Sequence, residues 1–264
     1  MGESELKRRI LTSLIIGSLI LPGVFGPKIL LLILTLFWIF MALRELLHIF
    51  HLKGRDLNPI LMVFLTLLLP ISFYLHLPII FIITGVIFVI TIYSLSSPTS
   101  SISLFSLSLF GIFYLGWLPS HLILLKNLNI SVWYIFFPFA LTWINDTAAY
   151  GIGVWIGKHK LFRKVSPKKS IEGTIGGICF SIGSAIGYAR LFSLKGSPWI
   201  YLWVGFSLSL IALLGDLLES SLKREVGLKD SSRLLPGHGG FLDRIDSLLF
   251  TIPLFYYLLK YLIL

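Results

Sequence analysis

Two aspartates in the second half of the chain lie inside strongly apolar segments. Asp146 stands in the stretch Asn145–Tyr150 (N-D-T-A-A-Y), and Asp216 lies near the end of a later apolar run. A carboxylate at the centre of a membrane helix costs roughly 2.5 to 3.5 kcal/mol, so it is retained there by a function or by a partner. We therefore interpret Asp146 and Asp216 as candidates for chemistry that needs a fixed negative charge.

The residues that follow Asp216 carry polar groups at helical spacing. Asp216, Glu219, Ser220 and Lys223 stand at positions i, i+3, i+4 and i+7, which places them on one face of a helix. A polar face of this kind is excluded from acyl chains. We expect it to look into the protein or into water.

Another acidic pair marks the beginning of the last apolar run. Asp243 and Asp246 are three residues apart, with Arg244 between them, and follow the glycine-rich stretch 236–240 (P-G-H-G-G). The spacing predicts a shared helix face, and glycines beside a helix N-terminus can offer backbone N–H groups to an anion. The alternative is that both carboxylates only complement the helix dipole.

Together these aspartates predict a metal site. We expect Asp146, Asp216, Asp243 and Asp246 to converge near one face of the membrane, where like charges need a compensating cation. The chain has a single cysteine, Cys179, and its histidines are scattered. Oxygen ligands alone suit Mg²⁺, which usually keeps positions open for substrate phosphates and water.

A run of basic residues could bind the negatively charged phosphate groups of a substrate. Residues 158–173 (K-H-K-L-F-R-K-V-S-P-K-K-S-I-E-G) are interrupted by Pro167 and closed by Gly173, so we expect a structured loop. The alternative is a juxtamembrane segment that only attracts anionic lipid heads. The chain has neither a Walker A loop nor a strand followed by G-x-G-x-x-G, so a nucleotide would be held by metal and by lysine or arginine contacts.

The composition shows which elements must position these groups. Of 264 residues 56% are apolar and 13% charged, and the mean hydropathy is +0.91, which excludes a soluble globular protein. The first apolar run follows Lys7–Arg9 as a signal peptide would, but it lacks a small-x-small cleavage site, so we count it as a span. Nine apolar runs predict nine membrane helices, at about residues 10–25, 29–50, 57–75, 78–95, 101–118, 132–156, 174–193, 199–219 and 246–264.

Lysine and arginine in the connections predict the orientation, because short basic loops stay in the cytoplasm. With the N-terminus inside, sixteen basic residues face the cytoplasm and four face the outside. The sixteen are Lys7, Arg8, Arg9, Lys53, Arg55, Lys158, Lys160, Arg163, Lys164, Lys168, Lys169, Lys223, Arg224, Lys229, Arg233 and Arg244, and the four are Lys28, Lys126, Arg190 and Lys195. We expect a multi-pass protein of the plasma (inner) membrane with its polar catalytic cavity open to the cytoplasm.

The expected fold is therefore an all-α integral membrane protein. We divide it into residues 1–128, with about five spans, and residues 129–264, with about four spans and the chemistry. The catalytic part carries two cytoplasmic loops, 157–173 and 220–245. The first five spans contain little polar chemistry.

The segment 221–246 resembles the signature of the phosphatidate cytidylyltransferase (CDP-diacylglycerol synthase) family. It reads S-L-K-R, then K-D at 229–230, then P-G-H-G-G-F-L-D-R-I-D at 236–246. The stretches 145–150 and 166–177 (S-P-K-K-S-I-E-G-T-I-G-G) are also similar to that family, with Ser170 where threonine often stands. The resemblance is specific over roughly residues 130–250 and elsewhere rests on hydropathy.

The resemblance implies condensation of CTP with phosphatidic acid to CDP-diacylglycerol and pyrophosphate. It implies one or two Mg²⁺ ions and substrates at the bilayer surface. Apart from the resemblance, we expect no nucleic-acid partner and a homodimer as the oligomeric state. Asp216, Asp243 and Asp246 would hold the metal. The catalytic set would be Asp146, Asp216, Asp243, Asp246, Lys223 and Arg244, and the phosphate-binding set would be Lys168, Lys169, Glu172, Ser221, Arg224, Lys229, His238 and Gly239.

Two other classes of function stay open at this point. A cation-coupled transporter would also place carboxylates inside spans, but it would not need the basic residues gathered beside them. A CTP-dependent polyprenol or dolichol kinase shares the combination of basic and acidic groups. It should lack the intact run from Lys223 to Asp246.

Overall fold

The protein is almost entirely helical in the part of the chain that the structure describes. The computed structural model describes residues 17–264 except 19, 97–100, 233 and 236–238. These residues form two compact units, 1–128 with 225–245 and 129–224 with 246–264. We call them the first and the second unit and describe each by itself.

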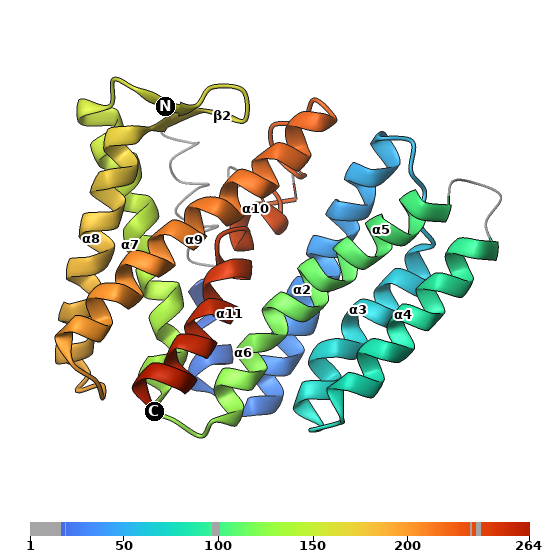
Figure 1. Ribbon diagram of the computed structural model, residues 1–264, viewed down its shortest axis with the longest axis horizontal. Coiled ribbons are helices and arrows are strands. Elements are labelled where there is room, and N and C mark those ends of the chain that lie inside the picture. Colours follow the sequence, from blue (N-terminus) through green and yellow to red (C-terminus); the bar gives the residue numbers. More distant parts are fainter. Residues whose placement is uncertain (1–16, 19, 97–100, 233, 236–238) are drawn as a thin grey trace. The chain divides into compact units, whose positions relative to one another are not determined.

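The first unit is a bundle of apolar helices. Figure 1 shows α3, α4 and α5 running side by side within it, and packing between each pair of them supports this arrangement. Its elements are α2 (Lys28–Leu52), α3 (Pro59–Tyr74), α4 (Ile79–Ser96), α5 (Ser101–Ile112), the π-helix η1 (Phe113–Trp117), α6 (Leu118–Asn127) and the short α10 (Leu242–Ile245). The long apolar face of α2 lies in the core of this unit, where Leu43 and Leu46 are fully buried.

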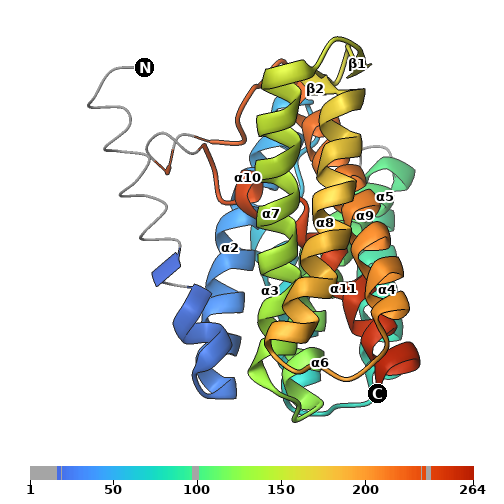
Figure 2. The same ribbon diagram turned by 90° about the vertical axis from the view of Figure 1, so that its left-hand side faces the viewer.

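The second unit contains the helices that carry most of the predicted chemistry. Figure 2 shows α7 and α8 side by side, joined at one end by a small β-hairpin. Its elements are α7 (Val132–Ile156), β1 (Lys160–Phe162), β2 (Ser166–Ser170), α8 (Ile171–Leu191), α9 (Pro198–Glu225), α11 (Leu248–Leu258) and the π-helix η2 (Leu259–Ile263). The two strands pair antiparallel, with Lys160 opposite Ser170.

Local chemistry explains where several of these helices begin. Asn58 precedes α3, and its side-chain oxygen accepts the N–H groups of Ile60 and Leu61 at 3.1 Å each, which satisfies donors that the first helical turn leaves open. Ser170 does the same for α8 by accepting the N–H of Gly173 at 3.1 Å. The expected loop 157–173 is thus a hairpin whose last residue caps the next helix.

The number of candidate membrane spans is smaller than the nine that we expected. Among the described residues five segments are long and apolar enough: Lys28–Leu52, Ile79–Ser96, Ile102–Asn127, Pro198–Glu225 and Leu242–Ile263. Half of the expected first span, residues 10–25, falls outside the described residues. α3 is apolar but has only 16 residues, while α7 and α8 are long enough but diluted by glycines and polar side chains. The chain is a multi-pass membrane protein, with at least these five candidates.

One expected span boundary was wrong. The span expected to end at residue 118 continues to Asn127, because Pro119 lies in the first turn of α6, directly after the π-helix, where its missing N–H costs little.

The helix face expected to carry both Asp243 and Asp246 was also wrong, because the two residues do not share one helix. α10 ends at Ile245, and the Asp246 carboxylate accepts the N–H of Ser247 at 2.6 Å in the turn before α11.

Close approach of α8 and α9 depends on the absence of a side chain at Gly205. A Cβ there would lie 2.8 Å from the Ile182 Cα and 2.8 Å from the Ser181 carbonyl oxygen. A hydrogen bond also joins the two helices here, since the Ser181 hydroxyl donates to the Gly205 carbonyl at 2.9 Å. Gly183 lies on the same helix pair but would meet nothing within 4 Å.

We therefore expect opposite effects from the same substitution at two glycines. Gly205→Ala should destabilise the protein by about 1 to 3 kcal/mol, because helix backbones must separate, whereas Gly183→Ala should be neutral or stabilise by up to about 1 kcal/mol. Thermal unfolding of both variants in one detergent measures this. Equal midpoints for the two variants would contradict the packing described for α8 and α9.

Candidate functional site

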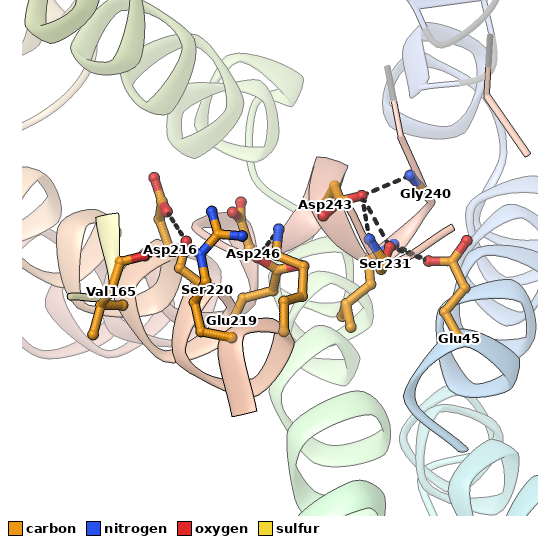
Figure 3. Close-up of polar contacts among 12 residues, drawn as sticks. Glu45, Val165, Asp216, Glu219, Ser220, Ser231, Gly240, Asp243 and Asp246 are labelled. Carbon is orange, nitrogen blue, oxygen red and sulfur yellow. Dashed lines mark hydrogen bonds and ion pairs between the residues drawn. The ribbon is translucent and has the colours of Figure 1, made fainter. Parts of the chain in front are cut away.

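The second unit brings Asp216 against a lysine of the basic hairpin. Lys169 on β2 and Asp216 on α9 form an ion pair with Nζ and Oδ2 2.5 Å apart, and both side chains are about three-quarters buried, with 25% and 29% exposure. The other carboxylate oxygen accepts the Ser220 hydroxyl at 3.2 Å, as Figure 3 shows. The helical spacing predicted for Asp216 and Ser220 is confirmed.

Lys223 is held inside the protein by the same helix face. Its ammonium lies 2.5 Å from a Glu219 carboxylate oxygen, with side-chain exposures of 10% and 1%. A charge this deeply buried persists only when it is paired. The prediction that this face looks into the protein is confirmed for Glu219 and Lys223.

Asp246 lies within electrostatic reach of two other predicted aspartates. Asp246, in the turn before α11, experiences the charges of Asp216 on α9 and Asp146 on α7, and also that of Lys223. Three like charges at this range favour a nearby cation. Among the described residues, however, no group of three or more Asp, Glu, His or Cys side chains is arranged as a ready metal site.

Asp146 is oriented by a polar contact that our sequence analysis missed. The neighbouring Asn145 donates to Asp146 Oδ1 at 3.2 Å and accepts the Ser209 hydroxyl at 2.5 Å. Gly177 permits this arrangement, since a Cβ there would lie 2.9 Å from the Asn145 side-chain oxygen. Asn145 was visible in the N-D motif, but its partner on α9 was not.

The hairpin presents basic side chains and is closed by Glu172. Lys168 is exposed, and the Arg224 guanidinium Nε donates to the Val165 carbonyl at 3.3 Å. Glu172 lies 2.6 Å from His159 Nδ1 and accepts the His159 N–H at 3.2 Å. Its own backbone N–H first, and then His159, hold the pKa of the Glu172 carboxyl well below its usual range, at about 2.

Asp243 belongs to the first unit, where Ser231 and Gly240 donate to its carboxylate. Its Oδ2 atom accepts the Ser231 N–H at 2.9 Å, the Ser231 hydroxyl at 3.0 Å and the Gly240 N–H at 2.7 Å, as drawn in Figure 3. Gly239 has φ +79°, and a Cβ there would lie 2.5 Å from Asp243 Oδ2. Gly239 is therefore required by the backbone and by this carboxylate.

Glu45 is the acidic residue that we overlooked. It lies on α2, is 3% exposed, and accepts hydrogen bonds from residues near Asp243. The signal was available, because Glu45 is the one acid inside an apolar run of the first half of the chain, and the cost argument used for Asp146 applies to it equally.

For the remaining predicted residues we describe only exposure and location. Ser221 is half-buried on α9, while Lys229 and Arg244 are exposed in the first unit. His238 lies outside the described residues. The roles assigned to all these site residues stay predictions.

The known proteins to which the chain is similar share one family. The model of the cytidylyltransferase family matches residues 7–262. A Staphylococcus saprophyticus protein named phosphatidate cytidylyltransferase is 33% identical over 254 residues, which cover 94% of this chain and 97% of that protein. Proteins of the same name from Staphylococcus aureus and Staphylococcus epidermidis are 48% and 49% identical over 121 residues, so the match covers 46% of this chain and 46% of each of them.

The low pKa of Glu172 predicts a pH dependence of stability. A carboxyl with a folded pKa of about 2 and an unfolded value of 4.5 stabilises the fold above pH 4.5, and that stabilisation is lost as the pH falls toward 2. The difference in thermal midpoint between wild type and Glu172→Gln should fall by more than half from about pH 5 to about pH 3. A difference that stays constant over this range would show that Glu172 does not close the hairpin through its charge.

Proposed function

The chain belongs to the cytidylyltransferase family, and we propose that it condenses CTP with phosphatidic acid. A phosphate oxygen of the lipid attacks the α-phosphorus of CTP, and the bond from that phosphorus to the bridging oxygen of the β-phosphate breaks. CDP-diacylglycerol forms and pyrophosphate leaves. The observation that carries the proposal is one charged cluster in the second unit. In it Lys169 pairs with Asp216 and Lys223 pairs with Glu219, so side chains from separate family motifs lie together.

The reaction needs positioning and charge neutralisation more than a strong base. The lipid phosphate already carries negative charge near neutral pH, so the nucleophile needs no activation by proton removal. Catalysis in phosphoryl-type transfers comes mainly from alignment and electrostatic stabilisation. The protein has the groups for both.

The basic residues would bind the phosphates. An ammonium has three donors, so Lys169 can keep its bond to Asp216 and still donate to a phosphate oxygen. Lys223 is oriented by Glu219, while Lys168, Arg224, Lys229 and Arg244 are exposed to solvent, where a substrate can reach them. We assign these four residues, with Lys169 and Lys223, to the triphosphate, the lipid phosphate and the departing pyrophosphate.

The carboxylates suit Mg²⁺ by their chemistry. Asp216, Asp243 and Asp246 would hold one or two ions, with Asp146 as a further ligand or an orienting residue, and hard oxygen donors of this kind match magnesium. When bound, the ion would neutralise charge on the triphosphate. The charges of Asp146 and Asp216 both act on Asp246, which supports a cation there.

We further propose where the chemistry takes place. The excess of basic residues in the connections supports an orientation with the N-terminus and the catalytic cavity on the cytoplasmic side of the plasma membrane. Residues 129–264 would form the catalytic part, residues 1–128 would shape the access of the lipid, and the working form would be a homodimer.

The activity is tested directly with purified protein in lipid nanodiscs. CTP labelled in the cytidine or at the γ-phosphate is supplied with phosphatidic acid and Mg²⁺. We expect the cytidine label in the lipid and the γ-label in pyrophosphate. A γ-label in the lipid would indicate a lipid kinase instead, and no label in the lipid would contradict both enzymes and favour transport.

A single substitution tests the assignment of Asp243. Asp243→Asn should lower turnover by at least about 10²-fold, because the amide cannot supply the charge that the site needs, while Asn can still accept from Ser231 and Gly240. The matched control is Asp56→Asn, at an exposed aspartate that contacts His51. Near wild-type turnover of Asp243→Asn in folded, membrane-inserted protein would rule out the metal role.

A further inference from the structure

Both ends of the loop from Ser231 to Leu242 donate hydrogen bonds to one carboxylate, on a helix far away in the sequence. Glu45 Oε2 accepts the Ser231 hydroxyl at 2.8 Å and the Leu242 N–H at 2.8 Å. Glu45 Oε1 accepts the Ser232 hydroxyl at 2.6 Å and the Phe241 N–H at 3.0 Å. Each oxygen thus joins a hydroxyl from the start of the loop to a backbone N–H from its end.

We propose that Glu45 is a positioning residue for the transferase site, holding the two ends of the signature loop, 231–232 and 241–242, in the arrangement that places Asp243. This inference deepens the proposed function and rests on it for its catalytic part. Glu45 itself contacts none of the reacting groups in this assignment. It acts across 186 residues of sequence, through Ser231.

Ser231 connects Glu45 to the catalytic aspartate. Its hydroxyl lies 2.8 Å from Glu45 Oε2 and 3.0 Å from Asp243 Oδ2, and its backbone N–H donates to the same Asp243 oxygen. Figure 3 shows Ser231 between the two carboxylates. A hydroxyl has only one proton, so the two acceptors share it, and a change at Glu45 alters the contact to Asp243.

The glycine at position 240 is explained by this carboxylate. A Cβ on Gly240 would lie 2.0 Å from the Ser231 hydroxyl oxygen and 2.4 Å from Glu45 Oε2. No side chain fits there without displacing one of them. The second glycine of the G-G pair therefore makes room for the contact between Glu45 and Ser231.

An aromatic contact on the same face of α2 supports the loop from the other side. Trp38 is seven residues before Glu45, two helical turns along one face, and its indole N–H donates to the Phe241 carbonyl at 3.3 Å. The Phe241 ring meets the rings of Phe37 and Trp38 edge-on, at centroid distances of 5.8 and 5.1 Å. α2 thus holds Phe241 by its ring, its carbonyl and its N–H.

These contacts revise the role that we expected of the glycine-rich loop. The backbone N–H groups of Gly240, Phe241 and Leu242 all donate to carboxylates of the protein, to Asp243 and to Glu45. In this arrangement they are committed to shaping the loop. Phosphate contacts from this segment would come from side chains, such as Arg244.

The test is Glu45→Gln, which keeps the size of the side chain but replaces one acceptor oxygen by a donor. We expect amide hydrogen exchange in peptides covering 240–242 to become at least about tenfold faster, since a bond to a charged acceptor is lost. Turnover should fall by a similar factor with a smaller change in the KM for CTP. The control is Thr35→Val, a buried site on α2 whose hydroxyl bonds only within its own helix, to the Leu31 carbonyl at 2.7 Å.

A second variant keeps the test decisive if Glu45→Gln does not fold. Ser232→Ala removes one of the four donors and should accelerate exchange at 240–242 more weakly, with no additional effect when combined with Glu45→Gln. Unchanged exchange and turnover in either folded variant would overturn the proposal. Faster exchange in a protein whose wild type never labels lipid from CTP would confirm the loop contact and contradict the proposed function instead.

Discussion

The cost of placing charge in an apolar environment determines the arrangement of this protein. Glu45 is nearly inaccessible and is satisfied by four donors from the loop 231–242. In the second unit Glu219 is paired with Lys223, and Asp216 with Lys169. Because an unpaired charge would destabilise the fold by several kcal/mol, each pairing selects one position for the segment that provides the partner.

In the second unit, close helix packing brings polar side chains within hydrogen-bonding distance of one another. Gly205 and Gly177 allow α8 to approach its neighbours, and the second of these glycines leaves room for the Asn145 side chain. Asn145 in turn links Ser209 to Asp146. The small residues of α8 therefore serve the polar centre as well as the helix contacts.

Both ends of the loop 231–242 are bound by a helix of the apolar N-terminal part. The sequence shows little polar chemistry in that part, and we proposed for it a role in lipid access. Glu45 and Trp38 give α2 a second role, since both bind the loop that contains the family signature. The apolar bundle thus contributes the partners of both ends of this loop.

Composition and spacing by themselves determined the class and the motifs of the protein. Scarce charge and long apolar runs established a membrane protein, the spacing from Asp216 to Lys223 established a polar helix face, and the signature at 221–246 indicated the family. These properties are local, so a single sequence contains them. The length criterion was less reliable, because five segments rather than nine meet it among the described residues.

Only the tertiary structure decided which groups meet. The pairing of Lys169 with Asp216 and the contacts of Glu45 depend on segments far apart in the sequence. Periodicity identifies the face on which a residue lies, but not the element packed against that face. The partner of a buried charge is set by packing, which is why the role of Glu45 emerged from the fold.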